Sequence, residues 1–150
     1  MIIRDATEAD LPAIVALYAD DRLGAMREVL ADPLPAEYLQ GFIAIRDDPR
    51  HRLVVGELDG GIVATCQLSF LPHLNRRGGE RAQLEAVHVA GGRRSQGLGH
   101  ELMTWAIEQA RERGCNLVQL SSGVTRPDAH RFYDRLGFTA SHVGFKLLLR

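Results

Sequence analysis

Hydrophobic and polar positions along the chain switch several times between the two-residue period of strands and the 3.6-residue period of helices. The helical period is clearest over residues 97–113, where Leu98, Leu102 and Trp105 share one side and Gly114 supplies a stop signal. The other expected helices cover residues 11–18, 36–45 and 127–136, and the expected strands cover residues 2–4, 53–58, 62–70, 83–89, 116–121 and, at the end, Phe138 and 143–149.

Turn and cap signals place the boundaries between these elements. Thr7-Glu-Ala-Asp10 resembles an N-terminal capping box, and Asp59-Gly60-Gly61 is typical of a hairpin turn. Residues 20–35 have no regular period, and residues 72–80 form a polar loop. The order is strand, two helices, three strands, helix, strand, helix, strand, which predicts one α+β domain over residues 1–150 with a mixed, mostly antiparallel sheet.

Composition excludes several classes of protein. The apolar content of 45% and charged content of 25% are ordinary for a soluble domain, and the net charge of −1 disfavours a nucleic-acid or membrane surface. Cys66 and Cys115 lie in no partner motif, so we expect a cytoplasmic protein with both as small buried residues. The six histidines have no metal-ligand spacing, and we expect no metal.

The stretch from Leu84 to His100 carries the strongest chemical signal. It reads as a strand, a Gly-rich turn and the start of a helix, an arrangement whose free backbone N–H groups bind phosphate. Gly97 and Gly99 let an anion approach the main chain, and Arg93 and Arg94 add positive charge. His100-Glu101 follows where a P-loop needs Lys and Ser or Thr, and the turn comes too late in the chain for a Rossmann site.

Two motifs resemble those of the GNAT superfamily of acyl-CoA-dependent N-acetyltransferases. Arg94-Ser-Gln-Gly97-Leu-Gly99 matches its [Q/R]-x-x-G-x-[G/A] signature, and Ala129-His-Arg-Phe-Tyr-Asp-Arg-Leu-Gly-Phe138 resembles its A-x-x-F-Y-x-x-x-G-F segment. From Leu68 onward the chain is also similar to aminoalkylphosphonate acetyltransferases. The resemblance implies a three-layer fold with helices on both faces of the sheet and a splayed central strand pair.

The resemblance also implies an acetyl-CoA site and its residues. The pyrophosphate is expected on the loop formed by Arg94, Ser95, Gln96, Gly97, Leu98, Gly99 and His100. The pantetheine arm is expected along Val87, His88 and Val89. The family often has a cofactor-contacting Asn after the next strand, where this chain has residues 122–128, so Asp128 or Arg126 is the candidate substitute, and Phe132 is a further cofactor contact.

Two residues are candidates for the chemistry, which in this family is direct attack of the amine on the thioester. Tyr133 is the candidate general acid for the departing thiolate, and its alternative role is packing of the helix. Glu85 is the candidate base, directly or through water, and its alternative role is that of a structural acceptor; Gln83 is a further cleft residue. Strand alternation predicts Glu85 on the face of Val87 and Val89, opposite Ala86 and His88.

The sequence indicates less about the amine acceptor than about the acyl donor. Asp20, Asp21, Arg22 and Glu28 lie between the first two helices, where they suit a cationic amine or form an ordinary solvated face. The leading interpretation is an acetyltransferase for a small cytosolic amine; the alternatives are a protein amine acetyltransferase, a non-catalytic acetyl-CoA-binding module and, disfavoured by charge, a DNA-binding regulator. The apolar end at residues 143–149 predicts an interface strand and a homodimer.

Overall fold

The computed structural model describes residues 1–149, which divide into a first unit, Met1–Gln119, and a second unit that begins at Leu120. The strands are β1 (Ile2–Asp5), β2 (His51–Leu58), β3 (Gly61–Pro72), β4 (Glu80–Val89) and β5 (Leu117–Leu120). The helices of the first unit are α1 (Leu11–Tyr18), α2 (Arg22–Arg27), α3 (Ala36–Arg46), α4 (Asn75–Gly78) and α5 (Leu98–Glu112), with single 3-10 turns at Glu8–Asp10 and Gly91–Arg93. The second unit contains α6 (Pro127–Arg135).

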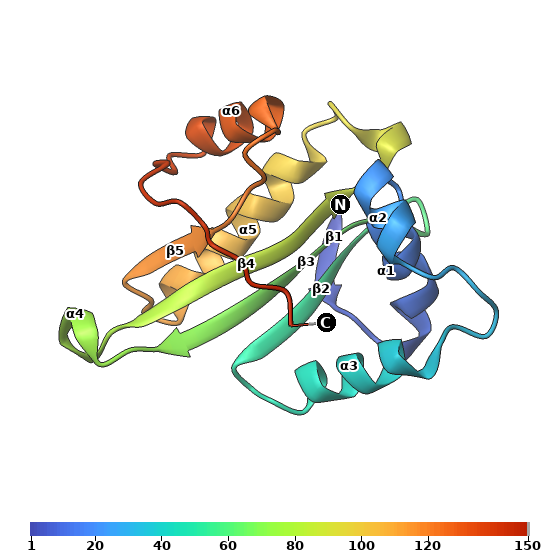
Figure 1. Ribbon diagram of the computed structural model, residues 1–150, viewed down its shortest axis with the longest axis horizontal. Helices are drawn as coiled ribbons and strands as arrows, with labels where there is room; N and C mark the ends of the chain where they lie inside the picture. Colours follow the sequence, from blue (N-terminus) through green and yellow to red (C-terminus); the bar gives the residue numbers. More distant parts are fainter. Residues whose placement is uncertain (150) are drawn as a thin grey trace. The chain divides into compact units, whose positions relative to one another are not determined.

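The sheet has the order β1-β2-β3-β4-β5, and its first four strands are antiparallel neighbours. β5 follows the crossover through α5 and runs in the same direction as β4 (Figure 1), so the predicted mixed, mostly antiparallel sheet is confirmed. Asn116 N–H donates to the Glu80 carbonyl at 2.9 Å just before β5 begins. Further along, the Gln119 side chain donates to the Gln83 side chain at 2.6 Å. Both contacts join β5 to β4, its neighbour in the sheet.

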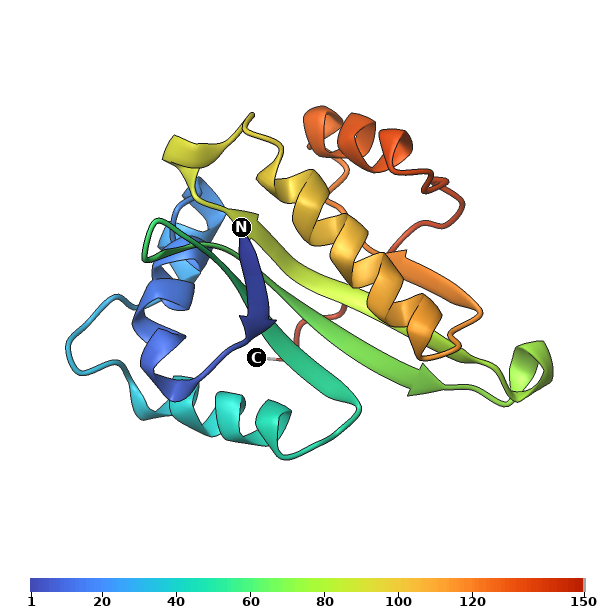
Figure 2. The ribbon, with the colours of Figure 1, turned by 180° about the vertical axis from the view of Figure 1, so that it is seen from behind.

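Helices cover both faces of the sheet, as expected. Neighbouring strand residues point to opposite faces, so Leu53 joins a core with α1 and α3 while Arg52 reaches α5, where it lies 5.1 Å from the Trp105 ring centre. In Figure 2, which views the molecule from the opposite side to Figure 1, α5 lies in front of the sheet. The α5 side chains that are buried against the sheet are Leu98, Leu102, Met103, Ala106 and Ala110. Each fully buried Leu or Met contributes roughly 1.5–3 kcal/mol to folding.

The predicted capping box before α1 is present. The Asp10 carboxylate accepts from Thr7 N–H at 2.8 Å and from two nitrogens of Arg4 at 2.7 and 3.0 Å. Arg4 also donates to Glu57 on β2 at 3.1 Å. The Arg4 hydrogen bonds lower the pKa of Asp10 to about 2, so this carboxylate binds Arg4 in its charged form. Arg4 thereby links β1 to the start of α1 through Asp10 and to β2 through Glu57.

One short helix was missed in the irregular stretch of residues 20–35. α2 begins after Asp21, whose carboxylate accepts from Gly24 N–H at 2.6 Å. This bond satisfies an amide that has no partner inside the helix, which lets a helix of only six residues form. An Asp before a possible helix start was the available signal, but the hydrophobic period was too short to detect.

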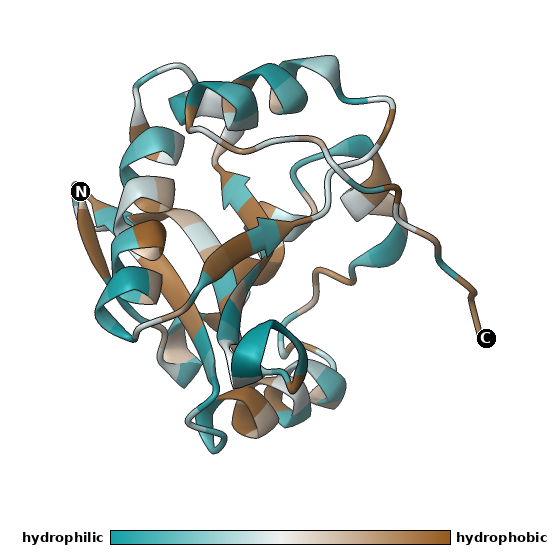
Figure 3. Cartoon of the chain, turned by 90° about the vertical axis from the view of Figure 1, so that its left-hand side faces the viewer, coloured by the Kyte–Doolittle hydropathy of each residue, from teal (hydrophilic) through white to brown (hydrophobic). Residues whose placement is uncertain are grey.

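The predicted strands at Phe138 and residues 143–149 do not form. The described chain after Gly137 has no regular secondary structure, and Val143, Phe145 and Leu147 are 74, 93 and 84% exposed. Figure 3 colours most of this end segment as hydrophobic. A strand requires a hydrogen-bonding neighbour, and the segment pairs with none of the strands described.

Candidate active site

The Gly-rich turn forms an anion-binding loop in front of α5. Gly97 precedes the helix with φ of 78°, in the left-handed region, and no side chain caps the helix. The N–H groups of Leu98, Gly99 and His100 have no intrahelical partners in the first turn of a helix. The helix dipole adds partial positive charge at the same point, so the loop has the properties required for a phosphate group.

The charged side chains around this loop interact with different partners. Arg94 Nε donates to the Val89 carbonyl at 3.4 Å, and the side chain remains exposed. Arg93 forms an exposed ion pair with Asp59 at 3.4 Å, whereas Arg94 has no acidic partner among the described residues. Asp20 accepts from Gly91 N–H at 2.6 Å, which anchors the loop to the end of α1. Asp20 is therefore a structural acceptor.

A β-bulge in β4 determines which side chains face the site. Glu85 pairs with Gln67 and His88 pairs with Thr65, so two β4 residues lie opposite one residue of β3. Ala86 takes φ of 50° at this point. The extra residue reverses the alternation, and Glu85, Ala86 and His88 line one pocket. The prediction that Glu85 lies opposite Ala86 and His88 is wrong for this reason.

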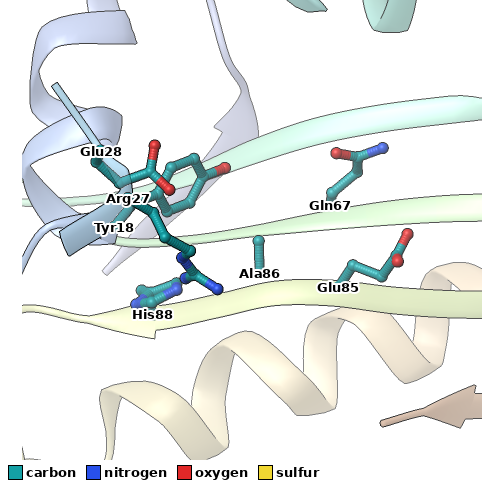
Figure 4. A pocket seen from close by; sticks show the side chains of 7 residues that line it. All are labelled: Tyr18, Arg27, Glu28, Gln67, Glu85, Ala86 and His88. Atoms are coloured by element: carbon teal, nitrogen blue, oxygen red, sulfur yellow. The ribbon is translucent and has the colours of Figure 1, made fainter. Parts of the chain in front are cut away.

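The pocket has a volume of about 580 Å³ and lies in the first unit. Figure 4 shows its lining side chains, which come from the end of α1, from α2 and the residue after it, and from β3 and β4. They are Tyr18, Arg27, Glu28, Gln67, Glu85, Ala86 and His88. The volume is in the range of small-molecule sites.

Tyr18 is a pocket residue that sequence reasoning missed, because its position fits the apolar side of a helix. Burial, with Cys66 and Glu28 nearby, raises its pKa to about 12, and a hydrogen bond with Thr65 opposes this. Its ring centre lies 5.3 Å from that of His88. Tyr18 therefore remains protonated at neutral pH as a hydrogen-bonding group.

Among the acidic residues predicted for the acceptor site, Glu28 lines the pocket. Its carboxylate accepts from the Tyr38 hydroxyl at 2.8 Å, and that hydroxyl accepts from Val29 N–H at 2.9 Å. Burial of the Tyr38 hydroxyl raises its pKa. Asp21 caps α2, and Arg22 is exposed outside the lining. Tyr38 thus holds the chain after α2 and orients Glu28.

Glu85 lies in the pocket in an environment different from the one expected. A carboxylate within an apolar strand suggested a buried, costly charge, but Glu85 is exposed at the bulge. Exposure removes the desolvation argument for a functional role and leaves the argument from position. Gln83, two residues earlier, bonds to Gln119.

The second unit contains three of the predicted site residues, Asp128, Phe132 and Tyr133, all on α6. Tyr133 lies on α6 with its ring edge-on to Phe132 and Phe138, at centre distances of 5.2 and 5.9 Å. Asp128 is exposed and bonds to Arg131 one turn later. The Ser122 hydroxyl is buried and has no hydrogen-bond partner among the described residues. A buried hydroxyl of this kind is suited to a polar group of a ligand.

The described residues contain neither a reactive thiolate nor a cluster of metal ligands. Cys66 is fully buried, which raises its pKa to about 12, and burial also raises the pKa of the half-buried Cys115. Both remain thiols at neutral pH. Residues 1–149 contain no group of three potential metal ligands and no helix with the length and hydropathy needed to cross a membrane.

Comparison with known proteins identifies the family. The profile of the acetyltransferase (GNAT) family matches residues 12–138. The chain is 31% identical over 144 residues to an aminoalkylphosphonate N-acetyltransferase from Salmonella typhimurium, covering 95% of this chain and 88% of the relative. A solved structure described as a transcriptional regulator from Bacillus halodurans is 45% identical, with a TM-score of 0.96 and 99% of each chain covered.

A more distant structure supports the fold alone. Glucosamine-6-phosphate N-acetyltransferase from Arabidopsis thaliana is 21% identical, with a TM-score of 0.82 and coverage of 99% of this chain and 98% of the other. The family profile spans the anion-binding loop, the bulged strand and α6. The chain therefore belongs to the GNAT acetyltransferase family, whose members transfer acetyl groups from acetyl-CoA to amines.

Proposed function

We propose that this protein acetylates the primary amine of a small molecule, with acetyl-CoA as donor. The observation that carries this proposal is the pocket of about 580 Å³ lined by Glu85, which has room for a small acceptor. A relative named for its action on aminoalkylphosphonates supports a small acceptor over a protein amine. The two free cysteines are typical of a reducing compartment, so the proposed setting is the cytosol.

The residues present fit acetyl-CoA. The pyrophosphate would accept from the amides of the loop from Arg94 to His100, with Arg94 as the charged partner. The pantetheine arm would pair with main-chain groups of residues 87–89, next to the bulge. The buried Ser122 hydroxyl, which follows β5 where the family often has Asn, is our first candidate for a further cofactor contact. Phe132 and Asp128 remain candidates, although Asp128 already bonds to Arg131.

The chemistry needs a neutral amine and a proton for the leaving thiolate. The amine nitrogen attacks the thioester carbonyl carbon, and the carbon–sulfur bond breaks as the tetrahedral intermediate collapses. Glu85 takes a proton from the amine, directly or through a water, and Tyr133 gives its hydroxyl proton to the sulfur. Direct attack is favoured over an acyl-enzyme, because burial raises the pKa values of both cysteine thiols.

Thermal unfolding with acetyl-CoA, with NADH and ATP as controls, tests the donor site. At ~100 times Kd a ligand adds about 2.7 kcal/mol, which raises the Tm of a domain of this size by roughly 5–10 °C. An amine panel read by release of the CoA thiol then tests catalysis. A Tm shift without thiol release for any amine supports the non-catalytic module, and no shift at millimolar acetyl-CoA refutes the proposed donor.

A DNA-binding regulator is the second candidate, because the 45% identical structure is described as a transcriptional regulator. The net charge of −1 gives such a protein no overall attraction to phosphates. A gel shift on duplex DNA at low salt separates the two candidates. A shift that disappears above about 200 mM salt would indicate non-specific binding, and a sequence-dependent shift would favour the regulator.

The exposed apolar end supports a homodimer. Val143, Phe145 and Leu147 occupy alternate positions, as in a strand with one apolar face, and all three are exposed. A second copy of the chain offers the same segment and so can form a symmetric interface. Sedimentation at micromolar concentration tests this proposal, and a monomer at all concentrations refutes it.

A further inference from the structure

The pocket contains two opposite charges that the protein does not neutralise. Among residues 1–149, neither the Arg27 guanidinium nor the Glu85 carboxylate has a hydrogen bond or ion pair, although both line the cavity. Most other arginines of the first unit do have partners, such as Arg4 with Asp10 and Arg113 with Glu80. The third charged residue of the lining, Glu28, is bonded to Tyr38.

These charges lie at different ends of the pocket. In Figure 4, Arg27 lies near His88 and Tyr18 at one end of the pocket. Glu85 lies at the other end, on the side of Gln67, and Ala86 lies between the two ends. The strand register supports this separation, because Glu85 pairs with Gln67 while His88 pairs with Thr65, two residues along β3. Two residues of a strand span roughly 7 Å. The small Ala86 side chain leaves the space between the two ends open.

We infer that the acceptor is a short primary amine that also carries an anionic group, with Arg27 as the residue that binds the anion. This inference rests on the proposed function, because it assigns the Glu85 end to the amine that reacts. A guanidinium gives an oxyanion charge-assisted hydrogen bonds, often two in parallel. Bound with its amine still protonated, an acceptor of this class would neutralise both free charges at once, and transfer of the proton to Glu85 would then give the neutral amine that attacks. An amine without an anion would neutralise Glu85 alone.

The test measures kcat and KM by thiol release for four amines of similar length. Three carry an anion, namely 2-aminoethylphosphonate, taurine and β-alanine, and the fourth, propylamine, carries none. The wild type is compared with Arg27→Met and Arg27→Lys. Arg22→Met is the matched control, because Arg22 is an exposed residue of the same helix outside the pocket lining.

We expect the wild type to prefer at least one anionic amine over propylamine by more than about tenfold. Arg27→Met should lower kcat/KM for that amine by about 10- to 100-fold, the range of a lost charge-assisted hydrogen bond, chiefly through KM. The loss for propylamine should be much smaller. Arg27→Lys should recover part of the activity, and Arg22→Met should match the wild type. The preferred anion then distinguishes phosphonate, sulfonate and carboxylate.

Equal losses for charged and uncharged amines in Arg27→Met would overturn the inference, because they indicate a structural role. A wild type that prefers propylamine would overturn it as well. Failure of the proposed function has a different signature, since no amine would then release thiol even though acetyl-CoA still raises the Tm. Raising the ionic strength gives a further check, because it screens the Arg27 contact in addition to the Glu85 contact and should therefore raise KM more for the anionic amine than for propylamine.

Discussion

Gly24 provides the sharpest structural test of the acceptor pocket. It is buried in α2, and a Cβ at this position would lie 1.7 Å from the Tyr18 carbonyl oxygen at the end of α1. Real Cβ contacts are essentially never under 3.0 Å, so Gly24→Ala must move the two helices apart by about 1.3 Å. Both helices line the pocket, α1 through Tyr18 and α2 through Arg27. The substitution therefore deforms the pocket without removing any side chain from it.

The expected losses follow from this displacement. A shift of ~1 Å in a positioning element lowers the rate by about 10²-fold, so kcat/KM for the best amine should fall by about that factor in Gly24→Ala. Overpacking of this kind costs about 1–3 kcal/mol in the free energy of unfolding, measured by urea titration. Acetyl-CoA binding should fall much less than kcat/KM, because its phosphate loop is formed by the end of β4 and the start of α5, and α1 reaches that loop through the Asp20 side chain.

Gly41→Ala is the matched control for this substitution. Gly41 lies inside α3, where an added Cβ meets no atom within 4 Å. Alanine there should stabilise the helix by about 0.5–1 kcal/mol and leave kcat/KM unchanged. Wild-type kcat/KM in Gly24→Ala would refute the reasoning, as would equal losses in the two variants, because either result would mean that the contact with Tyr18 does not position the pocket.

Four further predictions test other parts of the molecule. Tyr133→Phe should lower kcat by about 10²–10⁴-fold and leave the Kd of acetyl-CoA unchanged, and unchanged turnover would remove Tyr133 from the mechanism. Gly97→Glu should abolish the rise in Tm with acetyl-CoA, because it adds strain at positive φ and a negative charge beside the phosphates; a retained rise would contradict the loop assignment. Asp10→Asn should lower stability by about 2 kcal/mol at pH 7, because the hydrogen bonds from Arg4 hold the pKa of Asp10 at about 2 in the folded protein. The difference from wild type in urea unfolding should shrink as the pH falls from about 4 toward 2, and a constant difference would contradict the Arg4 assignment. Phe145→Asp should give a monomer in sedimentation if the chain end is the dimer contact, whereas an unchanged dimer would place the interface elsewhere.

The sequence carried most of the information about the regular elements. The long helix α5, the hairpin between β2 and β3 and the cap before α1 all depend on local signals, namely periodicity, turn residues and a capping carboxylate. Local signals failed where structure depends on a distant partner. The apolar alternation at residues 143–149 predicted a strand, but a strand also needs a neighbour. α2 was missed because six residues are too few to show a period.

The candidate site shows the same limit more sharply. Glu85 and His88 were named from the sequence, but on opposite faces, because alternation assumes an unbroken ladder. At Ala86 the φ of 50° inserts one extra residue, and both side chains then face the pocket. Tyr18 and Arg27 were not identified at all, because they reach this pocket only through the packing of α1 and α2 beside β4. The bulge that makes the sequence prediction fail is therefore also the feature that forms the site. It turns the side chains of Glu85 and His88 to the same side of β4. It also leaves between them the open space that an acceptor with two charged ends would occupy.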